Sequence, residues 1–361
     1  MIGSTPIWRW IRAGRSGSLV SKLRLPLPKG SKRWWDGTGT VLESVVFLLA
    51  LSLTWWIRRF ALAGKLLDIP NERSLHTLPT PRGGGLAIVV AFYSGALWLY
   101  FRGELDPVLL WGLLCALPVA AVSMVDDVVS LSPKIRLAVQ GLSAVAALWV
   151  LREHLALDLY WFRLEGVWTA PIFFLAILWL TNLYNFLDGI DGYAASEAIF
   201  VSWGAYLFFH SEVLLLLGFA ALGFLCFNRP KASIFMGDVG SAFLGFVFAV
   251  FAIYFSDRPG ALWIWLVLLG LFWFDATLTL WRRYRNGERL SQAHRKHAYQ
   301  RIVQAGWTHR KTLLAGMALN LLGLALLYPA ADSPWIVPVA MVWMVVLYRI
   351  VRYIDSRKAF S

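Results

Sequence analysis

The sequence predicts an all-α integral membrane protein, a polytopic bundle of about eleven transmembrane helices. Of its 361 residues, 58% are hydrophobic and only 15% are charged, which is far from the balance of ordinary globular proteins. Apolar runs long enough to cross a bilayer recur along the chain. Lysine and arginine gather in alternate loops between these runs, as expected for a polytopic topology.

The predicted spans start at the first long apolar run and continue almost to the end of the chain. They cover about residues 43–62, 83–101, 108–125, 137–152, 168–187, 194–210, 212–227, 239–256, 260–281, 312–330 and 334–352. Between the fourth and fifth spans, residues 153–168 alternate apolar and polar side chains and predict a short external hairpin. The basic loops are expected in the cytoplasm, so eleven spans place the N-terminus outside and the C-terminus inside.

Residues 1–40 do not fit this scheme, because they are rich in lysine and arginine yet would lie outside. They lack an apolar core of signal-peptide length before Val41. We interpret them either as a mis-called start or as a basic tail on a membrane surface, and residues 41–361 as the transmembrane domain. The net charge of +13 follows the loops of a membrane protein, so no nucleic-acid partner is expected.

One polar segment, NLYNFLDGIDG at residues 182–192, follows an apolar run and is the strongest candidate for a site. Asn182, Asn185, Asp188 and Asp191 are three residues apart, a spacing that places polar side chains on one helical face. Gly189 and Gly192 are expected to mark the point where the helix gives way to a turn. Two carboxylates and two amides at the end of an apolar helix are costly unless they bind something. We expect a divalent cation or a substrate here.

Two earlier loops also carry unusual polar residues. DIPNERSLHTLPTPRGGG, at residues 68–85, places Arg73, His76 and Arg82 beside three glycines, which suits a phosphorylated ligand as well as a solvated connector. The adjacent Asp126 and Asp127 end the third span. Two such carboxylates require a neighbouring cation or a raised pKa, unless they simply reach water. Lys134 and Arg136 are the cations closest in sequence.

Two later loops complete the set. Asp238 lies between glycines in FMGDVG, just before the eighth span, where it is either a metal ligand or an ordinary helix cap. HRKHAYQR, at residues 294–301, is strongly basic and favours an anionic partner, although a positive-inside anchor would look the same. Asp275, within the ninth span, suits pairing with an Arg or Asn of a neighbouring helix as well as catalysis.

These five segments, in order and on one predicted side, resemble the polyprenyl-phosphate N-acetylhexosamine-1-phosphate transferases. This is glycosyltransferase family 4, which includes phospho-MurNAc-pentapeptide transferase and the enzymes that initiate O-antigen and teichoic-acid glycans. The resemblance covers about residues 43–352 and rests on DIPNERSLHTLPTPRGGG, the Asp pair with SPKIR, NLYNFLDGIDG, NRPKASIFMGD and HRKHAYQR. Each motif is weak alone, but their order and common sidedness make the combination specific.

The resemblance implies Mg²⁺-dependent transfer of a sugar 1-phosphate from a UDP-N-acetyl sugar to undecaprenyl phosphate, with release of UMP. Mn²⁺ is the alternative cation. By position, Asn185 and Asp238 resemble the metal ligands. The predicted catalytic residues are Asp126, Asp127, Lys134, Asp188 and Asp191. The predicted substrate-binding residues are Arg73, His76, Arg82, Asn182, His294, Arg295, His297 and Arg301.

The resemblance also implies a bacterial inner-membrane enzyme with its active site facing the cytoplasm, in contact with membrane lipids and in some relatives a homodimer. HRKHAYQR differs from the triple-histidine loop of the pentapeptide branch, which argues against a MurNAc-pentapeptide donor without choosing among GlcNAc, FucNAc and QuiNAc. The competing interpretations are a polytopic transporter and a non-catalytic scaffold. A transporter would be expected to place its acids near mid-membrane, whereas here they lie at predicted cytoplasmic helix ends.

Overall fold

The computed structural model describes residues 38–64, 67–70, 78–290, 292 and 294–360. Clustering of contacts separates Met1–Gly39 from the compact unit Thr40–Ser361. The basic extension predicted at residues 1–40 lies outside the described residues except at its end, where the first described helix begins. The helices, the hairpins and the cavity belong to the unit Thr40–Ser361.

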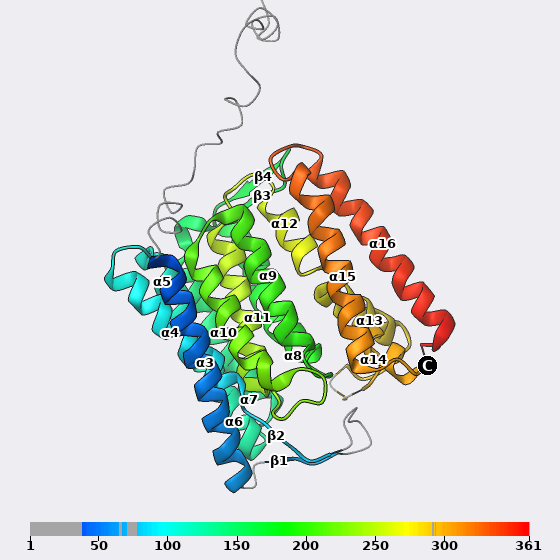
Figure 1. The fold of residues 1–361 in the computed structure, drawn as a ribbon. Coiled ribbons are helices and arrows are strands. Elements are labelled where there is room, and N and C mark those ends of the chain that lie inside the picture. The colour runs from blue at the N-terminus through cyan, green and yellow to red at the C-terminus, as the bar shows by residue number, and fades with distance from the viewer. Residues whose placement is uncertain (1–37, 65–66, 71–77, 291, 293, 361) are drawn as a thin grey trace, which may run out of the picture. The chain divides into compact units, whose positions relative to one another are not determined.

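This unit is built almost entirely from helices (Figure 1). The α-helices are α3 (Thr38–Ala63), α4 (Gly85–Phe101), α5 (Pro107–Leu114), α6 (Leu117–Val129), α7 (Pro133–Val150), α8 (Ala170–Phe186), α9 (Tyr193–Phe209), α10 (Glu212–Asn228), α11 (Asp238–Tyr254), α12 (Ala261–Leu268), α13 (Gly270–Arg285), α14 (Ala298–Gln304), α15 (His309–Leu327) and α16 (Ile336–Arg357). Short 3-10 turns occur at Arg152–His154, Val167–Thr169 and Tyr328–Ala330.

Each apolar run in the sequence corresponds to one helix or to a consecutive pair. The predicted span 108–125 is divided into α5 and α6, because Pro118 in the first turn of α6 has no N–H to continue the hydrogen bonding of α5. The predicted span 260–281 is divided into α12 and α13, which are bent by 78° at Leu269. That bend was not predicted from the sequence.

Five helical segments in the described residues are long and apolar enough to cross a membrane, or six if the bent α12–α13 pair counts as one span. They are Thr40–Ala63, Pro107–Val129, Val167–Phe186, His309–Ala330 and Ile336–Arg357. Three shorter apolar helices, α4, α10 and α11, accompany them. The structure is therefore that of a multi-pass helical membrane protein.

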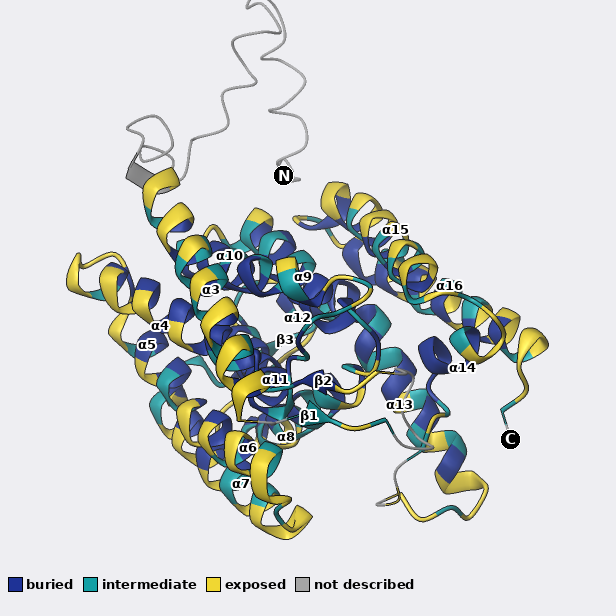
Figure 2. Cartoon of the chain, turned by 60° about the horizontal axis from the view of Figure 1, so that its bottom comes forward, coloured by how far each residue is buried: buried dark blue, intermediate teal, exposed yellow. Residues whose placement is uncertain are grey.

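Helix α11 lies at the centre and packs against α8, α6 and α4. Most of its side chains are buried, whereas the outer helices α3, α7 and α16 expose many apolar residues (Figure 2). Gly85 at the start of α4 touches Gly240 in the first turn of α11, where a Cβ on Gly85 would lie 2.3 Å from the Cα of Gly240. This close approach fixes the loop that carries Arg82 against the N-terminus of α11.

Two small antiparallel hairpins lie at opposite ends of the unit (Figure 1). Strand β1 (Leu67–Asp68) pairs with β2 (Thr80–Pro81). Strand β3 (Ala156–Asp158) pairs with β4 (Arg163–Glu165), with Leu157 opposite Leu164. The second pair confirms the hairpin that the alternating pattern predicted at residues 153–168.

Helices α9 and α15 share a buried polar pair. The Asn320 Nδ2 atom donates to Glu197 Oε2 at 2.5 Å, and both side chains are fully buried. The other two oxygens, Glu197 Oε1 and Asn320 Oδ1, have no partner among the described residues. The carboxyl group therefore depends on this one amide for its partner.

We expect Asn320→Leu to lower the free energy of unfolding by about 1–3 kcal/mol, because it leaves the buried carboxyl group without a hydrogen bond. Thermal unfolding in detergent measures this. Glu197→Gln is the matched control, since a glutamine can still accept from Asn320 and can donate to its free oxygen. Equal melting temperatures for Asn320→Leu and the unmodified protein would show that the pair contributes nothing.

Candidate active site

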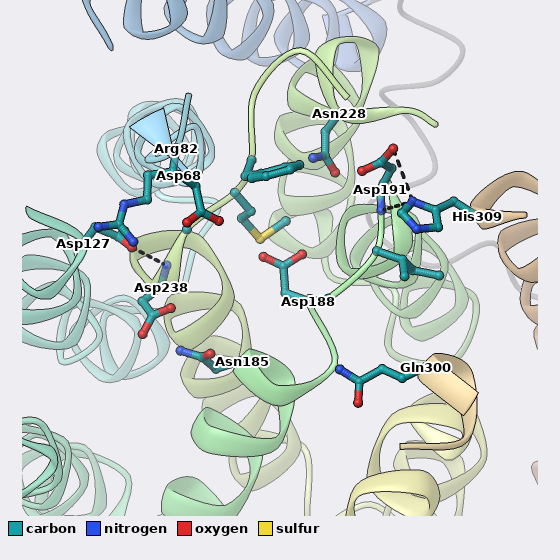
Figure 3. A pocket seen from close by; sticks show the side chains of 15 residues that line it. Asp68, Arg82, Asp127, Asn185, Asp188, Asp191, Asn228, Asp238, Gln300 and His309 are labelled. Atoms are coloured by element: carbon teal, nitrogen blue, oxygen red, sulfur yellow. Dashed lines mark hydrogen bonds and ion pairs between the residues drawn. The ribbon is translucent and has the colours of Figure 1, made fainter. Parts of the chain in front are cut away.

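A polar cavity of about 230 Å³ lies where α6, α8, α10, α11, α14 and α15 end or begin. Figure 3 shows its side chains. Its lining consists of Asp68, Arg82, Asp127, Asn185, Asp188, Gly189, Ile190, Asp191, Asn228, Phe235, Met236, Gly237, Asp238, Gln300 and His309. Segments far apart in the sequence thus contribute to one acidic cavity.

The segment between α8 and α9 forms one wall. Helix α8 ends at Phe186, and α9 begins after Gly192, whose φ of +74° is left-handed. The chain turns tightly at Gly189, where a Cβ would lie 2.1 Å from the Tyr299 hydroxyl oxygen. That hydroxyl donates to the carbonyl oxygen of Phe186 at 3.1 Å. The prediction that these glycines mark the end of the helix is confirmed.

The opposite wall is the N-terminus of α11, which begins at Asp238. The Asp127 carboxylate accepts hydrogen bonds from the N–H groups of Asp238 at 3.2 Å and Val239 at 3.3 Å. A carboxylate in this position is stabilised by the positive end of the helix dipole. Asp127 therefore caps α11 and also lines the cavity.

Arg136 holds two of the predicted acidic residues. Its Nη1 atom lies 2.6 Å from Asp126 Oδ2 and 2.8 Å from Asp238 Oδ2. Asp126 also accepts from the Leu131 N–H at 2.6 Å and does not line the cavity. Of the two cations closest in sequence, the structure places Arg136 beside the acids, whereas Lys134 is exposed and outside the cavity lining.

Asp188 lies between the two walls (Figure 3). Burial raises its pKa well above the ordinary aspartate value, and the negative charges of Asp238, Asp127 and Asp191 raise it further. A carboxyl group in such surroundings favours either a proton or a cation.

The pKa of Asp191 is shifted in the opposite direction to that of Asp188. Burial acts to raise its pKa, but a hydrogen bond from His309 and backbone N–H groups lower it below the ordinary value. His309 Nδ1 lies 3.3 Å from Asp191 Oδ2, and the N–H groups of Lys231 and Ala232 lie at 2.9 and 3.2 Å from the same oxygen. Asp191 is therefore an ionised carboxylate whose Oδ2 atom is held by His309 and by two backbone N–H groups.

The donor set suits a hard divalent cation. Asn185 lies within hydrogen-bonding reach of the Asp238 carboxylate, and both face the cavity with Asp127 and Asp188. In the described part of the chain, no group of three or more His, Cys, Asp or Glu side chains is arranged so that it could hold a metal ion without other ligands. Mg²⁺ needs no such cage, because it keeps several waters and takes one or two protein oxygens plus phosphate. The residues therefore fit a Mg²⁺ ion shared with a phosphorylated ligand.

The predicted substrate-binding residues are placed differently from one another. Arg82 lines the cavity. Arg73 and His76 lie outside the described residues. Asn182 donates to Gln140 Oε1 at 2.8 Å and to the Leu178 carbonyl at 2.7 Å, away from the cavity lining.

In the HRKHAYQR segment, Gln300 lines the cavity, whereas the predicted substrate-binding residues contact other parts of the protein. His297 is buried, with Nδ1 3.6 Å from Asp275 Oδ1. Asp275 accepts hydrogen bonds from the Thr279 hydroxyl group and from two backbone N–H groups of α14, so its partners are not the predicted Arg or Asn. Arg301 is buried and bonded to Asp355 at 2.6 Å. His294, Arg295, His297 and Arg301 are all absent from the cavity lining.

His294, the first residue of this segment, is neutral at neutral pH. Burial and the positive charges of His297 and Arg283 lower the pKa of His294 to about 4. Its Nδ1 atom accepts the Lys296 N–H at 3.2 Å, which leaves Nε2 as the protonated nitrogen at neutral pH. His294 can therefore act as a hydrogen-bond donor but not as a cation.

Four lining residues escaped the sequence reasoning: Asp68, Asn228, Gln300 and His309. Asn228 joins two walls, since its Oδ1 accepts the Gly192 N–H at 3.0 Å and its Nδ2 donates to the Ile234 carbonyl at 2.9 Å. Asp68, Asn228 and Gln300 lie within the motifs described above, so their position in the sequence could have indicated a role in the site. His309 lies outside these motifs, next to Arg310 and Lys311, and nothing in the sequence distinguishes it.

Comparison with known proteins identifies the family of the chain. The model of the family described as glycosyl transferase family 4 matches residues 109–256, which include α6, α8 and the start of α11. A relative from Leuconostoc citreum (strain KM20), named phospho-N-acetylmuramoyl-pentapeptide-transferase, is 30% identical over 219 residues, or 53% of this chain and 67% of the relative. The chain belongs to glycosyl transferase family 4. The family resemblance seen in the sequence is thereby confirmed.

Other members of glycosyl transferase family 4 align over more of the chain. The probable undecaprenyl-phosphate N-acetylglucosaminyl 1-phosphate transferase of Bacillus subtilis (strain 168) is 28% identical over 290 residues, covering 75% of this chain and 78% of the relative. The undecaprenyl-phosphate alpha-N-acetylglucosaminyl 1-phosphate transferase of Thermotoga maritima is 27% identical over 288 residues, covering 77% and 88%. Sugar-1-phosphate transferases that act on polyprenyl phosphate thus resemble most of the chain.

Proposed function

We propose that the protein transfers an N-acetylhexosamine 1-phosphate from a UDP-sugar to undecaprenyl phosphate, with Mg²⁺ as cofactor or Mn²⁺ in its place. The observation that carries this proposal is the acidic cavity, which brings Asn185 and Asp238 together with Asp127 and Asp188. Family membership supports a transferase over a transporter or a scaffold. The relatives named as N-acetylglucosaminyl 1-phosphate transferases support an N-acetylhexosamine donor.

The reaction forms one phosphorus–oxygen bond and breaks another. An oxygen of undecaprenyl phosphate attacks the phosphorus that bears the sugar, and the bond from that phosphorus to the UMP oxygen breaks. The acceptor phosphate is already mostly ionised at neutral pH, so a general base is scarcely needed. The chain must therefore align the two phosphates and offset their charge.

Different residues in and around the cavity would align the phosphates and offset their charge. A bound Mg²⁺ would neutralise charge on the diphosphate, with Asn185 and Asp238 as its protein ligands. Arg136 holds Asp238 in place and Asp127 fixes the α11 N-terminus on which Asp238 sits. Arg82 is a cation in the lining and suits a phosphate oxygen.

The nucleotide is assigned to the Asp191 end of the cavity. His309 lies there, and the Phe235 ring also lines the cavity. An aromatic face beside polar groups can stack on a base while the polar groups fix its orientation. This placement agrees with the nucleotide-side role that the family resemblance implies for Asp188 and Asp191.

The lipid chain is assigned to an apolar cavity of about 190 Å³ between α8, α11, α12 and α13. Phe173, Trp179, Ala249, Trp265 and Trp273 are among its lining residues. Helices α12 and α13 both contribute to this lining, and they are bent by 78° relative to each other. A cavity lined by aromatic and aliphatic side chains suits a polyprenyl tail.

The full proposal includes the topology predicted from the sequence. It has eleven spans, the N-terminus outside, the C-terminus in the cytoplasm and the active site facing the cytoplasm. The setting is the bacterial inner membrane with its lipids, with a homodimer as the proposed assembly. The product would initiate a cell-surface glycan such as O-antigen.

A panel of sugar nucleotides tests the reaction. Purified protein in detergent receives undecaprenyl phosphate, Mg²⁺ and one of UDP-GlcNAc, UDP-FucNAc, UDP-QuiNAc or UDP-MurNAc-pentapeptide, and mass spectrometry follows UMP and the lipid product. We expect turnover of at least one N-acetylhexosamine donor. Turnover of the pentapeptide donor alone would overturn the donor assignment. Absence of UMP release with every donor, together with no binding of UDP or UMP, would overturn the transferase proposal.

A further inference from the structure

The end of the chain is bound to the segment that leads into the active site. Asp355, in the last turn of α16, accepts two hydrogen bonds from Arg282, each of 3.0 Å, and one from Arg301 of 2.6 Å. The Arg301 side chain is 3% exposed. Bidentate, charge-assisted bonds with little exposure to water are among the stronger polar contacts in proteins.

Arg301 also connects two backbones. Its Nη1 donates to the carbonyl oxygen of Lys358 at 3.0 Å, and its Nε donates to the carbonyl oxygen of Lys296, also at 3.0 Å. One guanidinium group thus joins the C-terminal segment to the HRKHAYQR segment. The planar fork of arginine makes these bonds together, whereas a lysine has a single point charge.

The Phe360 ring completes the contact. Three cations lie over it, with Arg282 and Arg301 at 5.3 Å and Lys296 at 5.6 Å from the ring centroid. Each such cation–π contact is attractive at these distances. Lys296 is the cation that also binds Glu288, at 2.9 Å. Phe360 therefore gathers side chains from α13, from the loop and from α14.

Helix α14 connects the contact at the C-terminus with the cavity. Gln300, which precedes Arg301, lines the cavity. At the N-terminus of α14, the Ala298 and Tyr299 N–H groups donate to Asp275 at 2.8 and 3.3 Å. Helix α14 is only seven residues long, so it depends on these tertiary contacts for its position.

We propose that Asp355, Lys358 and Phe360 form a C-terminal latch that positions α14 and the HRKHAYQR segment for binding of the sugar-nucleotide donor. Its members are positioning residues, since none of them lines the cavity. The role in donor binding rests on the proposed function, whereas the role in ordering α14 does not. The latch acts through Arg301, which joins Asp355 and Lys358 to the residue that follows Gln300.

Phe360→Leu tests the latch with little change in apolar volume. We expect the donor KM to rise about tenfold, equal to about 1.4 kcal/mol, with kcat within about twofold because the acidic residues at the metal site are untouched. Amide hydrogen exchange at residues 294–304 should become about tenfold faster. Phe360→Tyr, which keeps the ring, should restore both values.

Asp355→Asn is the second variant and should show the same two changes, because it weakens the bonds from Arg282 and Arg301. Arg357→Ala is the control, since its guanidinium lies over Tyr353 at 5.1 Å and not on the latch. Unchanged exchange and unchanged KM in both Phe360→Leu and Asp355→Asn would overturn the proposal. If the unmodified protein shows no transferase activity, the proposed function fails, and the exchange measurement alone decides whether the latch orders α14.

Discussion

Asp238→Asn is expected to reduce kcat at least about a thousandfold, which corresponds to a loss of about 4 kcal/mol of transition-state stabilisation. Asp238 lies at the N-terminus of α11, bonded to Arg136 at 2.8 Å and within reach of Asn185. An asparagine keeps the size of the side chain but removes the charge that would hold the cation against the diphosphate. Release of UMP at saturating donor measures the effect.

The matched control is Asp257→Asn, which removes one exposed carboxylate after the other end of α11. Its kcat should equal that of the unmodified protein. Both variants need a melting temperature, because losing the bond to Arg136 also affects packing. A folded Asp238→Asn protein whose kcat lies within tenfold of normal would refute the metal-ligand assignment.

Removal of divalent cations is expected to abolish turnover and to lower the melting temperature. Asp188, Asp127 and Asp238 face one cavity, and without a cation their negative charges repel each other. EDTA should stop UMP release, and Mg²⁺ should restore it. Addition of Mg²⁺ to the cation-free protein should raise the melting temperature by about 3 °C or more, which corresponds to roughly 1 kcal/mol.

The size of this stabilisation should depend on pH. The pKa of Asp188 in the folded protein lies well above its ordinary value, through burial and the nearby Asp238, Asp127 and Asp191. The cation-free protein therefore loses stability as pH rises through that raised pKa, because Asp188 must ionise where charge is disfavoured. A bound cation removes this cost, so the Mg²⁺-induced shift in melting temperature should grow with pH.

Thermal scans with EDTA or Mg²⁺ across neutral pH, at constant ionic strength, measure this dependence. Asp238→Asn should show a smaller Mg²⁺-induced shift at every pH. A shift that falls as pH rises, or that sodium chloride reproduces, would contradict a specific cation site at these acids.

The apolar runs by themselves determined where the helices lie. Burial of a helix in a bilayer requires an uninterrupted apolar stretch, and such a stretch is a local property that can be read from the sequence. Alternation at residues 153–168 likewise predicted the β3–β4 hairpin. The bend between α12 and α13 was not predicted. It falls between Leu269 and Gly270, where α12 and α13 both pack against α16 and a Cβ on Gly270 would lie 2.7 Å from Trp343 Nε1.

The sequence also selected most of the acidic residues of the candidate site, because carboxylates at the ends of apolar helices are costly and stand out. It could not say which way they point. Adjacent residues on a helix are rotated by about 100°, so Asp127 reaches the α11 N-terminus whereas Asp126 bonds to Arg136 outside the cavity lining.

The contacts between site residues from distant segments could be seen only in the folded structure. Gln300 enters the cavity lining because Asp275 and Tyr299 fix α14 against α8 and α13. The same packing turns Arg301 toward Asp355 and away from the cavity, although its charge alone suggested an anionic substrate. The charge of a side chain, which the sequence shows, limits the kinds of group it can bind. The fold determines which of these groups lies within its reach.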